Sequence, residues 1–586
     1  MNKIEMDILL LLNDNSNYTQ RELSVISSYS LGAVNKALKE LTKLELIDEE
    51  LTLTSKGLDL INLNKPKNAI ILSAGFGLRM VPINKETLKP FLVVKNQKLI
   101  ERLIEQLLEV GIKKIYIVVG HQKEKFEYLI DKYGVELIVN RDYLEYNNLH
   151  SLNKVIRRIS NSYILPSDLY FESNPFRSNE LYSWYSFSSK NGLEYQVSIN
   201  RKNELNRTKN KIGNRMVGLA YFNKDDSIEL VNNIKSLVSD HNYDDKFWET
   251  AMFLPNKLNV LGKIIDEDDY QEINTYEELR EFDPRSSSLR SPIIDEISKA
   301  MNIDSIDIKK ITPLKTGMTN RSFLFEYNNE KYIMRIPGEG TDKLINRVDE
   351  YNVYQVIKDK NICDDIIYIN KNNGFKITKF IENSKVCDPF DFVQVSKCMK
   401  RLKEFHNLKL KVNHYFDIFE KINYYESLWG NNTSMYEDYE TTKKNVFALK
   451  EYIDSCDKEL VLTHIDAVPD NFLFSTIDGK ERINLIDWEY ASLQDPQVDI
   501  AMFAIYALYD KEEVDRLIDI YFEDKCDIKT RIKIYAYVAS CGLLWSNWCE
   551  YKAQLGVEFG EYSLRQYRFA KDFYRYAKEL MKEIGE

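Results

Sequence analysis

One stretch near the C-terminal end of the chain, residues 463–474, constrains its fold more than any other. It places Asp466 and Asn471 five residues apart in a polar loop, directly before the apolar run 472–474. A second apolar run leads into Asp487, so a hairpin of the two runs would bring the three polar side chains together. Phosphoryl transfer needs such a set, because a carboxylate takes the proton of the accepting hydroxyl and hard oxygen ligands hold magnesium. We therefore expect Asp466 to be the catalytic base, and Asn471 and Asp487 to be ligands of Mg²⁺.

The order H-x-D-x4-N at residues 464–471, followed by Ile-Asp-Trp-Glu at 486–489, resembles the catalytic loop and metal-binding strand of the choline kinase and aminoglycoside phosphotransferase group. The resemblance covers residues 293–586 and implies a two-lobed α+β kinase-like fold that uses ATP. Residues 495–499 resemble the D-P-x-x-D segment of these kinases, which implies that Asp499 braces the catalytic loop. A hairpin with surface acids is the alternative.

Upstream, the order of apolar runs resembles the N-terminal lobe of these kinases. Residues 323–326 alternate as a strand, and residues 331–336 form its hairpin partner. The resemblance implies that Arg335 is catalytic and stands where protein kinases have lysine; arginine keeps its charge and grips phosphate with a planar fork. Glu350 is expected to aim Arg335 through an ion pair, although a solvated helix carboxylate is an equal alternative. The nucleotide-binding candidates of this lobe are Gly317, Thr319, Asn320 and Glu350.

Two tryptophans near the end of the chain are candidates for the acceptor pocket. Trp545 and Trp548 are three residues apart and therefore lie on one face of a helix. Aromatic faces attract a quaternary ammonium, which cannot donate hydrogen bonds. The pair resembles the choline-binding tryptophans of choline kinases, and Glu489 is a weaker candidate for balancing the cation. Packing of both tryptophans in the core is the alternative.

A second distinctive stretch follows the apolar run 69–72. Gly75 and Gly77 let the backbone close around phosphates, and Arg79 supplies a positive charge. Lys89 follows ten residues later and places a second cation beside the same triphosphate. This pairing resembles the sugar-1-phosphate nucleotidyltransferase superfamily. We therefore expect Gly75 and Gly77 to bind nucleotide and Arg79 and Lys89 to be catalytic.

The residues after this stretch alternate between strand and helix patterns. Residues 99–110 are amphipathic at helical spacing, and residues 114–120 read as a buried strand. Such alternation predicts a mostly parallel sheet with ligands at the carboxyl ends of its strands. We expect a Rossmann-like α/β nucleotidyltransferase over residues 67–282.

Further residues resemble the CTP:phosphocholine cytidylyltransferase branch of that superfamily, namely Asn140, residues 146–148 and residues 151–152. The resemblance implies that CTP is the nucleotide. It also implies that Asn148 and Trp248 contact the substrate, with Trp248 facing a quaternary ammonium. A core position for Trp248 is an equal alternative.

The same resemblance makes Asp168 and Glu272 ligands of Mg²⁺. Asp168 ends a strand, where its carboxylate would face the phosphate loop. A turn-capping role for Asp168 is the alternative. The chain departs from the family at Asn274, where a second acid is usual. An amide keeps an oxygen ligand without its charge, so weaker metal binding or a degenerate transferase remains open.

The first 66 residues read as a winged helix-turn-helix domain (α+β). Helical patterns are followed by two short strand patterns at 44–47 and 51–54, with an acidic turn between them. Phosphate neutralisation drives DNA affinity. Residues 1–66 carry seven Lys or Arg against ten Asp or Glu, so DNA binding is not favoured and a docking or dimerising module is preferred.

The whole chain is too long for one core, since 586 residues imply several domains. The net charge of −11 argues against a general polyanion-binding protein. A linker is expected at 283–292, which is rich in Ser and Pro. The seven cysteines form no C-x-x-C pair, so neither a disulfide framework nor a zinc site is indicated. The N-terminus lacks a basic leader and no apolar run is long enough to span a membrane, so we expect a cytoplasmic protein without membrane association.

The two resemblances imply consecutive reactions. ATP and choline give phosphocholine, and CTP and phosphocholine then give CDP-choline and pyrophosphate. Two alternatives remain: an ethanolamine or other amino-alcohol kinase fused to a related nucleotidyltransferase, and a metabolite-sensing winged-helix regulator with degenerate enzyme domains. A homo-oligomer also remains open.

Overall fold

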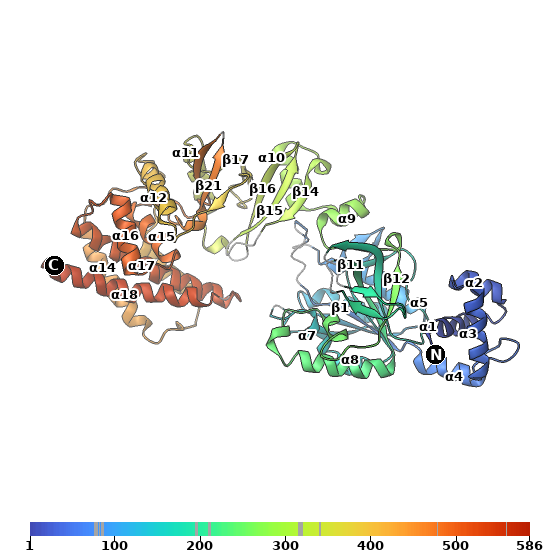
Figure 1. Ribbon diagram of the computed structural model, residues 1–586. Coiled ribbons are helices and arrows are strands. Elements are labelled where there is room, and N and C mark those ends of the chain that lie inside the picture. The colour runs from blue at the N-terminus through green and yellow to red at the C-terminus, as the bar shows by residue number, and fades with distance from the viewer. Residues whose placement is uncertain are drawn as a thin grey trace. The chain divides into compact units, whose positions relative to one another are not determined.

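A computed structural model gives the fold of the chain (Figure 1). The structure describes residues 1–75, 80, 82–83, 87–143, 145–193, 197–208, 212–314, 320–338, 341–477, 479–557 and 559–586. The chain divides into two compact units, Met1–Asp295 and Glu296–Glu586, which are described separately. The finer division into winged helix, transferase, linker and kinase remains a prediction.

The first unit begins with four helices. The helices are α1 (Lys3–Asp14), α2 (Gln20–Ser27), α3 (Leu31–Lys43) and α4 (Ser55–Asn64). The N-termini of α1 and α2 are fixed by capping boxes, in which the side chains of Asn2 and Thr19 accept from the backbone N–H groups of Glu5 and Glu22. Apolar side chains from these helices form one small core. The helix-turn-helix prediction is therefore confirmed.

The wing is smaller than the sequence predicts. In place of two strands, residues 44–54 contain one isolated bridge, between Ile47 and Leu53. Leu51 has a φ of 64°, which interrupts the extended backbone that a strand requires. The acidic turn lies between the bridged residues. The structure does not change the argument from net charge against DNA binding. DNA binding itself is untested.

A nine-stranded sheet forms the centre of the first unit. Its main strand order is β10-β9-β11-β6-β1-β4-β5, and β8 and β12 extend it beside β11. Strands β1 (Asn68–Ser73), β4 (Lys114–Val119), β5 (Glu136–Val139) and β6 (Ser162–Pro166) are parallel. The chain places β4 and β5 on one side of β1 and β6 on the other. The carboxyl ends of β1 and β6 therefore meet where the strand order reverses, which is where open α/β sheets bind ligands.

Helices and two small two-stranded sheets, β13-β7 and β2-β3, complete this unit. The remaining elements are β2 (Val93–Val94), β3 (Gln97–Lys98), α5 (Leu99–Glu109), α6 (Tyr128–Tyr133), α7 (Asn148–Asn153), β7 (Leu169–Phe171), β8 (Trp184–Leu193), β9 (Val197–Ile199), β10 (Leu205–Arg207), β11 (Ile212–Phe222), α8 (Lys224–Leu237), β12 (Leu261–Ile265), β13 (Tyr270–Glu272) and α9 (Tyr276–Phe282). In α5, apolar residues recur at helical spacing and bury one face against the sheet. The predicted alternation is thus confirmed for β1, β4, β5 and β6, whereas β11 pairs antiparallel with β6, β8 and β9, so the sheet is mixed rather than mostly parallel.

The segment predicted as a linker, 283–292, is held against the first unit. The hydroxyl of Ser288 accepts from the backbone N–H of Val93 at 2.9 Å, and Ser286 donates to the carbonyl of the same residue. Ser291 is 1% exposed. The serines that suggest a flexible linker therefore act as hydrogen-bonding groups along β2.

The second unit has the two lobes of a kinase. Its N-terminal lobe is an antiparallel sheet in the order β14-β15-β16-β18-β17, beside α11 (Arg347–Ile357). The strands are β14 (Lys309–Pro313), β15 (Asn320–Tyr327), β16 (Glu330–Pro337), β17 (Ile366–Ile369) and β18 (Lys376–Lys379), and α10 (Pro292–Met301) precedes them. The predicted hairpin of residues 323–326 with 331–336 is the β15–β16 pair.

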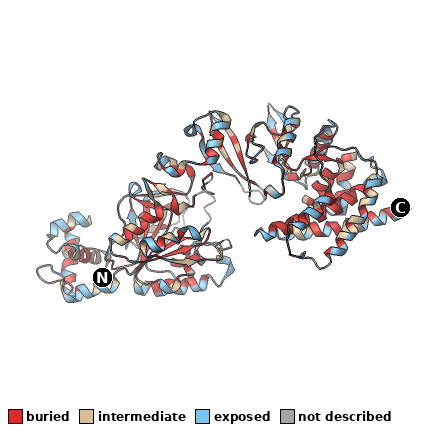
Figure 2. Ribbon diagram, turned by 180° about the vertical axis from the view of Figure 1, so that it is seen from behind, coloured by how far each residue is buried: buried red, intermediate tan, exposed pale blue. Residues whose placement is uncertain are grey.

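The other lobe of the second unit is mainly helical. Its elements are β19 (Lys385–Val386), α12 (Phe392–His406), α13 (Ile418–Ser427), α14 (Tyr439–Ser455), β20 (Val461–Thr463), β21 (Phe472–Ile477), β22 (Lys480–Leu485), β23 (Ser492–Gln494), α15 (Gln497–Tyr506), α16 (Lys511–Phe522), α17 (Ile528–Gln554) and α18 (Glu561–Glu583). Helix α17 is buried along most of its length, with exposed residues on the outer helices around it (Figure 2). This rigid centre carries the two predicted acceptor tryptophans.

The cysteines lie mostly inside the fold. All seven cysteines are free thiols, and five of them are buried. Within the described residues, no helix has the length and apolar character needed to cross a membrane.

Candidate active sites

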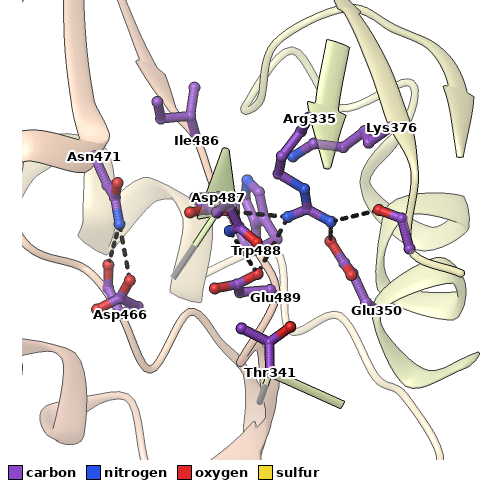
Figure 3. Close-up of polar contacts among 12 residues, drawn as sticks. Arg335, Thr341, Glu350, Lys376, Asp466, Asn471, Ile486, Asp487, Trp488 and Glu489 are labelled. Carbon is purple, nitrogen blue, oxygen red and sulfur yellow. Dashed lines mark hydrogen bonds and ion pairs between the residues drawn. The ribbon is translucent and has the colours of Figure 1, made fainter. Parts of the chain in front are cut away.

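The predicted hairpin of the second unit exists and brings its polar residues together. Strands β21 and β22 pair antiparallel, with Asn471 just before the first strand and Asp487 just after the second. The Asn471 amide donates to the Asp466 carbonyl at 2.8 Å and to its carboxylate at 3.1 Å (Figure 3). Ile465 and Asp487 have φ values of 69° and 63°, a region that L-residues and above all β-branched ones avoid. Such backbone strain persists only where surrounding contacts enforce it.

Asp499 supplies those contacts. Its carboxylate accepts hydrogen bonds from the backbone N–H groups of His464 at 2.9 Å and Ile465 at 2.7 Å, and from the His406 ring at 2.9 Å. The His464 ring in turn donates to the Ile486 carbonyl at 3.0 Å, which ties the catalytic loop to the strand before Asp487. Burial lowers the pKa of His464 to about 4, so this ring is neutral. The bracing contact expected for Asp499 is present.

The predicted base, Asp466, lies in an environment that shifts its pKa strongly. Burial, together with the nearby carboxylates of Asp487 and Glu489, raises its pKa to about 8. The raised pKa favours the protonated carboxyl near neutral pH, and a cation held beside it by Asn471 and Asp487 would lower that pKa and so favour the carboxylate that accepts a proton.

Arg335 lies at the centre of a buried charge cluster (Figure 3). It is 5% exposed and forms the predicted ion pair with Glu350. Its other terminal nitrogen donates to Asp487 at 3.0 Å and to Glu489 at 3.3 Å, and the guanidinium also donates to the Gly374 carbonyl. The pairing removes the alternative of a solvated Glu350, whose side chain is fully buried.

The contacts of Glu489 do not support its predicted role in balancing the acceptor cation. Its carboxylate accepts from the Asn320 amide at 3.0 Å and from Arg335, and it pairs with Arg347 at 3.5 Å. Glu489 does not line the aromatic cavity described below. The physical reason is charge neutralisation, since two buried guanidinium groups require carboxylate partners. Of the other nucleotide-binding candidates in this lobe, Gly317 and Thr319 lie outside the described residues.

A cavity of about 210 Å³ joins the catalytic residues to an aromatic wall. Asp466, Asn471 and Asp487 line one part of it. The aromatic wall consists of Tyr490, Tyr506, Trp545, Trp548 and Tyr562. The Trp545 ring meets the Trp548 and Tyr490 rings edge to face, with centroids 5.4 and 5.6 Å apart, and its indole N–H donates to the Met502 sulfur. The two predicted acceptor tryptophans therefore share one cavity with the predicted base.

The residues of this cavity fit a divalent cation. The Asn471 amide nitrogen bonds to Asp466, which leaves its oxygen without a hydrogen bond from the described part of the chain. Asp487 uses one carboxylate oxygen for Arg335, and its other oxygen is likewise without such a bond. Both side chains line the cavity. Magnesium accepts one or two protein oxygens when substrate phosphates supply the rest.

In the first unit, three side chains meet at the reversal of strand order. The Lys89 ammonium donates to the Asp168 carboxylate at 3.2 Å and to the Asn274 side-chain oxygen at 2.7 Å. Asp168 follows β6, and Gly75 follows β1, so both lie at the carboxyl edge of the sheet. The other phosphate-loop candidates, Gly77 and Arg79, lie outside the described residues.

The Asp168 carboxylate fits a metal ligand. Its Oδ1 atom is buried without a hydrogen-bond partner among the described residues, and burial raises its pKa. A cation placed there would satisfy this oxygen. The other predicted ligand, Glu272, pairs with Arg215 at 2.7 Å. Its role as a metal ligand stays a prediction.

The comparisons with known proteins agree with this geometry. Residues 311–540 match the family model for choline/ethanolamine kinases, residues 69–175 that for MobA-like NTP transferase domains, and residues 1–48 that for winged helix-turn-helix DNA-binding domains. Over 222 residues the chain is 32% identical to the choline-phosphate cytidylyltransferase of Streptococcus pneumoniae, which covers 37% of this chain and 96% of that protein. The chain belongs to the choline-phosphate cytidylyltransferase family.

The second unit of this cytidylyltransferase family member has relatives of its own. Protein LicA of Haemophilus influenzae is 28% identical over 263 residues, which cover 42% of this chain and 96% of that protein. The crystal structure of choline kinase LicA from Streptococcus pneumoniae is 30% identical and covers 48% of this chain and 98% of that one, with a TM-score of 0.43. The chain thus carries a cytidylyltransferase and a choline/ethanolamine kinase domain in one polypeptide.

In the cytidylyltransferase unit, Trp248 is placed differently from the prediction. The ring is 1% exposed and packs against Tyr185 and Phe222, with centroid distances of 5.9 and 6.1 Å. It is therefore a core side chain, which argues against contact with a quaternary ammonium. Asn148 accepts from the Trp248 backbone N–H at 2.7 Å and so positions the segment that follows. Its substrate contact stays a prediction.

The sequence resemblance covers the segment 247–249, but the carboxylate of Glu249 is not among the predicted site residues. Glu249 accepts from the Tyr185 hydroxyl at 3.1 Å, while its other oxygen is buried without a partner among the described residues. Burial raises its pKa to about 7. In the kinase unit the missed groups are Met502 and the tyrosines of the aromatic wall. Tyr490 had a signal, because it directly follows the Ile-Asp-Trp-Glu sequence.

Proposed function

We propose that the chain is a bifunctional enzyme that transfers a phosphoryl group from ATP to choline and then couples phosphocholine to CTP, with release of pyrophosphate. One observation carries the proposal, namely the cavity that joins Asp466 to the aromatic wall of Trp545 and Trp548. A base and a set of ring faces in one cavity suit an alcohol that carries a quaternary ammonium.

In the kinase reaction, Asp466 takes the proton of the choline hydroxyl while the hydroxyl oxygen of choline bonds to the γ-phosphorus of ATP. The bond from that phosphorus to the bridging oxygen breaks, and ADP leaves. Asn471 and Asp487 would hold Mg²⁺, which neutralises charge on the phosphates when bound. Glu350 keeps Arg335 beside Asp487, where its positive charge offsets the carboxylates of the site.

The trimethylammonium group has no N–H to donate, so hydrogen-bond acceptors give it no specific contact. The faces of Trp545, Trp548 and Tyr490 offer electrostatic attraction and exclude water. An ethanolamine ammonium would need carboxylate or carbonyl acceptors instead. We therefore propose choline as the preferred acceptor.

In the transferase reaction, a phosphate oxygen of phosphocholine attacks the α-phosphorus of CTP, and pyrophosphate leaves. Lys89 supplies positive charge for the phosphates, and Asp168, with its free buried oxygen, would hold Mg²⁺. Asn274 shares the Lys89 ammonium but adds no charge. Lys89 therefore contacts one carboxylate, that of Asp168, whereas a site with two acids would give it two.

Product analysis tests the proposal. The full chain is incubated with ATP, CTP and Mg²⁺, with choline or ethanolamine as the acceptor, and products are separated by chromatography. We expect phosphocholine, CDP-choline and pyrophosphate, all dependent on Mg²⁺, and lower yields from ethanolamine. Higher yields from ethanolamine than from choline would mean that ethanolamine is the preferred acceptor. Absence of turnover, with DNA binding that responds to choline, would favour the winged-helix regulator.

A further inference from the structure

The first unit contains a cavity that lies away from the transferase site. It has a volume of about 400 Å³ and is lined by α1 and the end of α2 on one side and by the transferase on the other. Its charged and aromatic lining includes Lys3, Asp7, Arg177, Glu180, Trp184 and Lys263. The helices α1 to α4 lie beside the sheet in this unit (Figure 1).

The contact between the two parts is fixed. The Tyr182 hydroxyl donates to the Asp7 carboxylate at 2.7 Å, and Leu181 is buried in the winged-helix core. The Asn161 amide donates to the Leu63 carbonyl at 2.8 Å, and the Tyr221 hydroxyl donates to the Asn64 carbonyl. These contacts join the winged helix to the transferase around the cavity.

Strand register places this cavity at the opposite edge of the sheet from Asp168. Trp184 pairs with Tyr221, and Tyr221 pairs with Tyr163 near the amino end of β6. Asp168 follows the carboxyl end of the same strand. The cavity is therefore separate from the phosphate-binding edge, and substrate binding does not explain it.

The acidic groups of the cavity are satisfied. Asp7 accepts from the Lys3 ammonium at 2.8 Å, from the Tyr29 hydroxyl at 2.6 Å and from Tyr182. Glu180 accepts from the Tyr163 hydroxyl at 2.9 Å. These bonds give both carboxylates hydrogen-bond donors from within the protein.

The donors are not satisfied. Lys263 makes one hydrogen bond, to the Pro175 carbonyl at 3.2 Å, and its ammonium lies 3.9 Å from the centroid of the Trp184 ring. No carboxylate among the described residues forms an ion pair with it. Trp184 is 1% exposed, and its indole N–H has no acceptor among the described residues. Arg177 is exposed and also lines the cavity.

Glu180 and Asp7 attract the Lys263 ammonium at longer range, but burial outweighs this attraction because it penalises a charged group that has no direct ion pair. The pKa of Lys263 is accordingly lowered to about 8 by burial. An anion in the cavity would give the ammonium a partner and the indole N–H an acceptor.

We propose that this cavity binds a small anionic metabolite, whose phosphate or carboxylate group is held by Lys263 and by the indole N–H of Trp184. Arg177 adds a third donor from the same cavity wall. β12, which carries Lys263, leads within a few residues to β13 and Glu272. A ligand here thus contacts the strand that continues toward the predicted metal site.

Calorimetric titration of the full chain tests the site, with sodium phosphate and sodium acetate as separate probes at constant ionic strength. The variants are Lys263→Gln, which removes the charge, and Trp184→Phe, which keeps a ring but removes the N–H. Lys202→Gln is the matched control, since Lys202 is exposed and does not line the cavity. Anion binding at the active sites is common to all four proteins and cancels in the comparison.

We expect the wild-type chain and Lys202→Gln to bind at least one probe about tenfold more tightly than either cavity variant, as loss of a charge-assisted hydrogen bond predicts. A response to phosphate alone assigns a phosphorylated ligand, and a response to acetate alone assigns a carboxylate. Equal binding of both probes by wild type, Lys263→Gln and Trp184→Phe, at unchanged melting temperatures, overturns the proposal. Trp184→Phe keeps the test decisive if Lys263→Gln unfolds.

Discussion

The two candidate active sites are assembled in different ways. The kinase residues Asp466, Asn471 and Asp487 come from one loop and hairpin, braced by Asp499. The transferase site joins Lys89 to residues 79 and 185 positions away in the sequence. The kinase site also has a defined acceptor cavity, whereas two phosphate-loop candidates of the transferase lie outside the described residues.

This difference shows which site depends on local structure and which on the whole sheet. The hairpin brings the polar residues of the kinase site together, and contacts from Asp499 and Arg335 then hold them in place. The transferase site depends on the register of β6 against β1 and on the return of the chain at β13. Changes in one unit should therefore leave the chemistry of the other intact.

The largest expected effect is at the kinase base. Asp466→Ala should lower choline phosphorylation by about 10² to 10⁴, because a positioned proton acceptor is lost. Cytidylyl transfer to supplied phosphocholine should be unchanged. Separate assays of the two reactions measure this. Asp470→Asn is the matched control, since Asp470 lines the same cavity but bonds to Tyr506. Kinase turnover within a few-fold of wild type in Asp466→Ala would remove the assignment.

The reciprocal change tests the transferase. Lys89→Ala should lower CDP-choline formation by about 10² to 10³, as expected when a charged group near the reacting phosphate is removed. ATP-dependent phosphocholine should accumulate. Lys95→Ala serves as the control, because Lys95 is an exposed lysine paired with Glu172. If the kinase reaction falls together with the transferase, the two sites are not independent.

Asn274→Asp sharpens the comparison. A second carboxylate beside Lys89 and Asp168 should increase the affinity for the cation, and the Mg²⁺ concentration for half-maximal transferase activity should fall by about tenfold. The kinase reaction of the same protein is the internal control for magnesium. An unchanged midpoint would mean that position 274 lies apart from the metal.

The smallest expected effect concerns acceptor choice. Trp545→Leu or Trp548→Leu should raise the choline KM by roughly two- to thirty-fold, since a cation over an indole contributes about 0.5 to 2 kcal/mol. Ethanolamine should be affected less, so the ratio of kcat/KM for the two acceptors falls. Both indoles are nearly buried, so melting temperatures are measured in parallel. A destabilised protein with an unchanged acceptor ratio would mean that the tryptophans are structural.

The sequence was sufficient for residues whose neighbours are close along the chain. The spacing of Asp466 and Asn471 and the apolar runs around Asp487 predict the hairpin, and the structure contains it. The alternating strands and helices likewise predict the parallel strands β1, β4, β5 and β6, but not the antiparallel pairing of β11 with β6, β8 and β9.

The sequence was insufficient where burial depends on distant residues. Trp248 and Trp545 are both predicted from sequence similarity to contact the substrate. Trp248 is enclosed by Phe222 and Tyr185, whereas Trp545 lines a cavity. Glu489 has arginine partners on β16 and α11, more than a hundred residues away. The spacing of residues near Glu489 in the sequence does not predict ion pairs with such distant arginines.

Complementation between two variants tests the central claim that one chain carries two consecutive, independent reactions. Asp466→Ala and Lys89→Ala are each supplied with ATP, CTP, Mg²⁺ and choline, and then mixed in equal amounts. Each variant alone should produce almost no CDP-choline, and the mixture should restore it, because phosphocholine made by Lys89→Ala reaches the intact transferase of Asp466→Ala. A mixture that remains inactive, or either variant forming CDP-choline from choline by itself, would contradict the account.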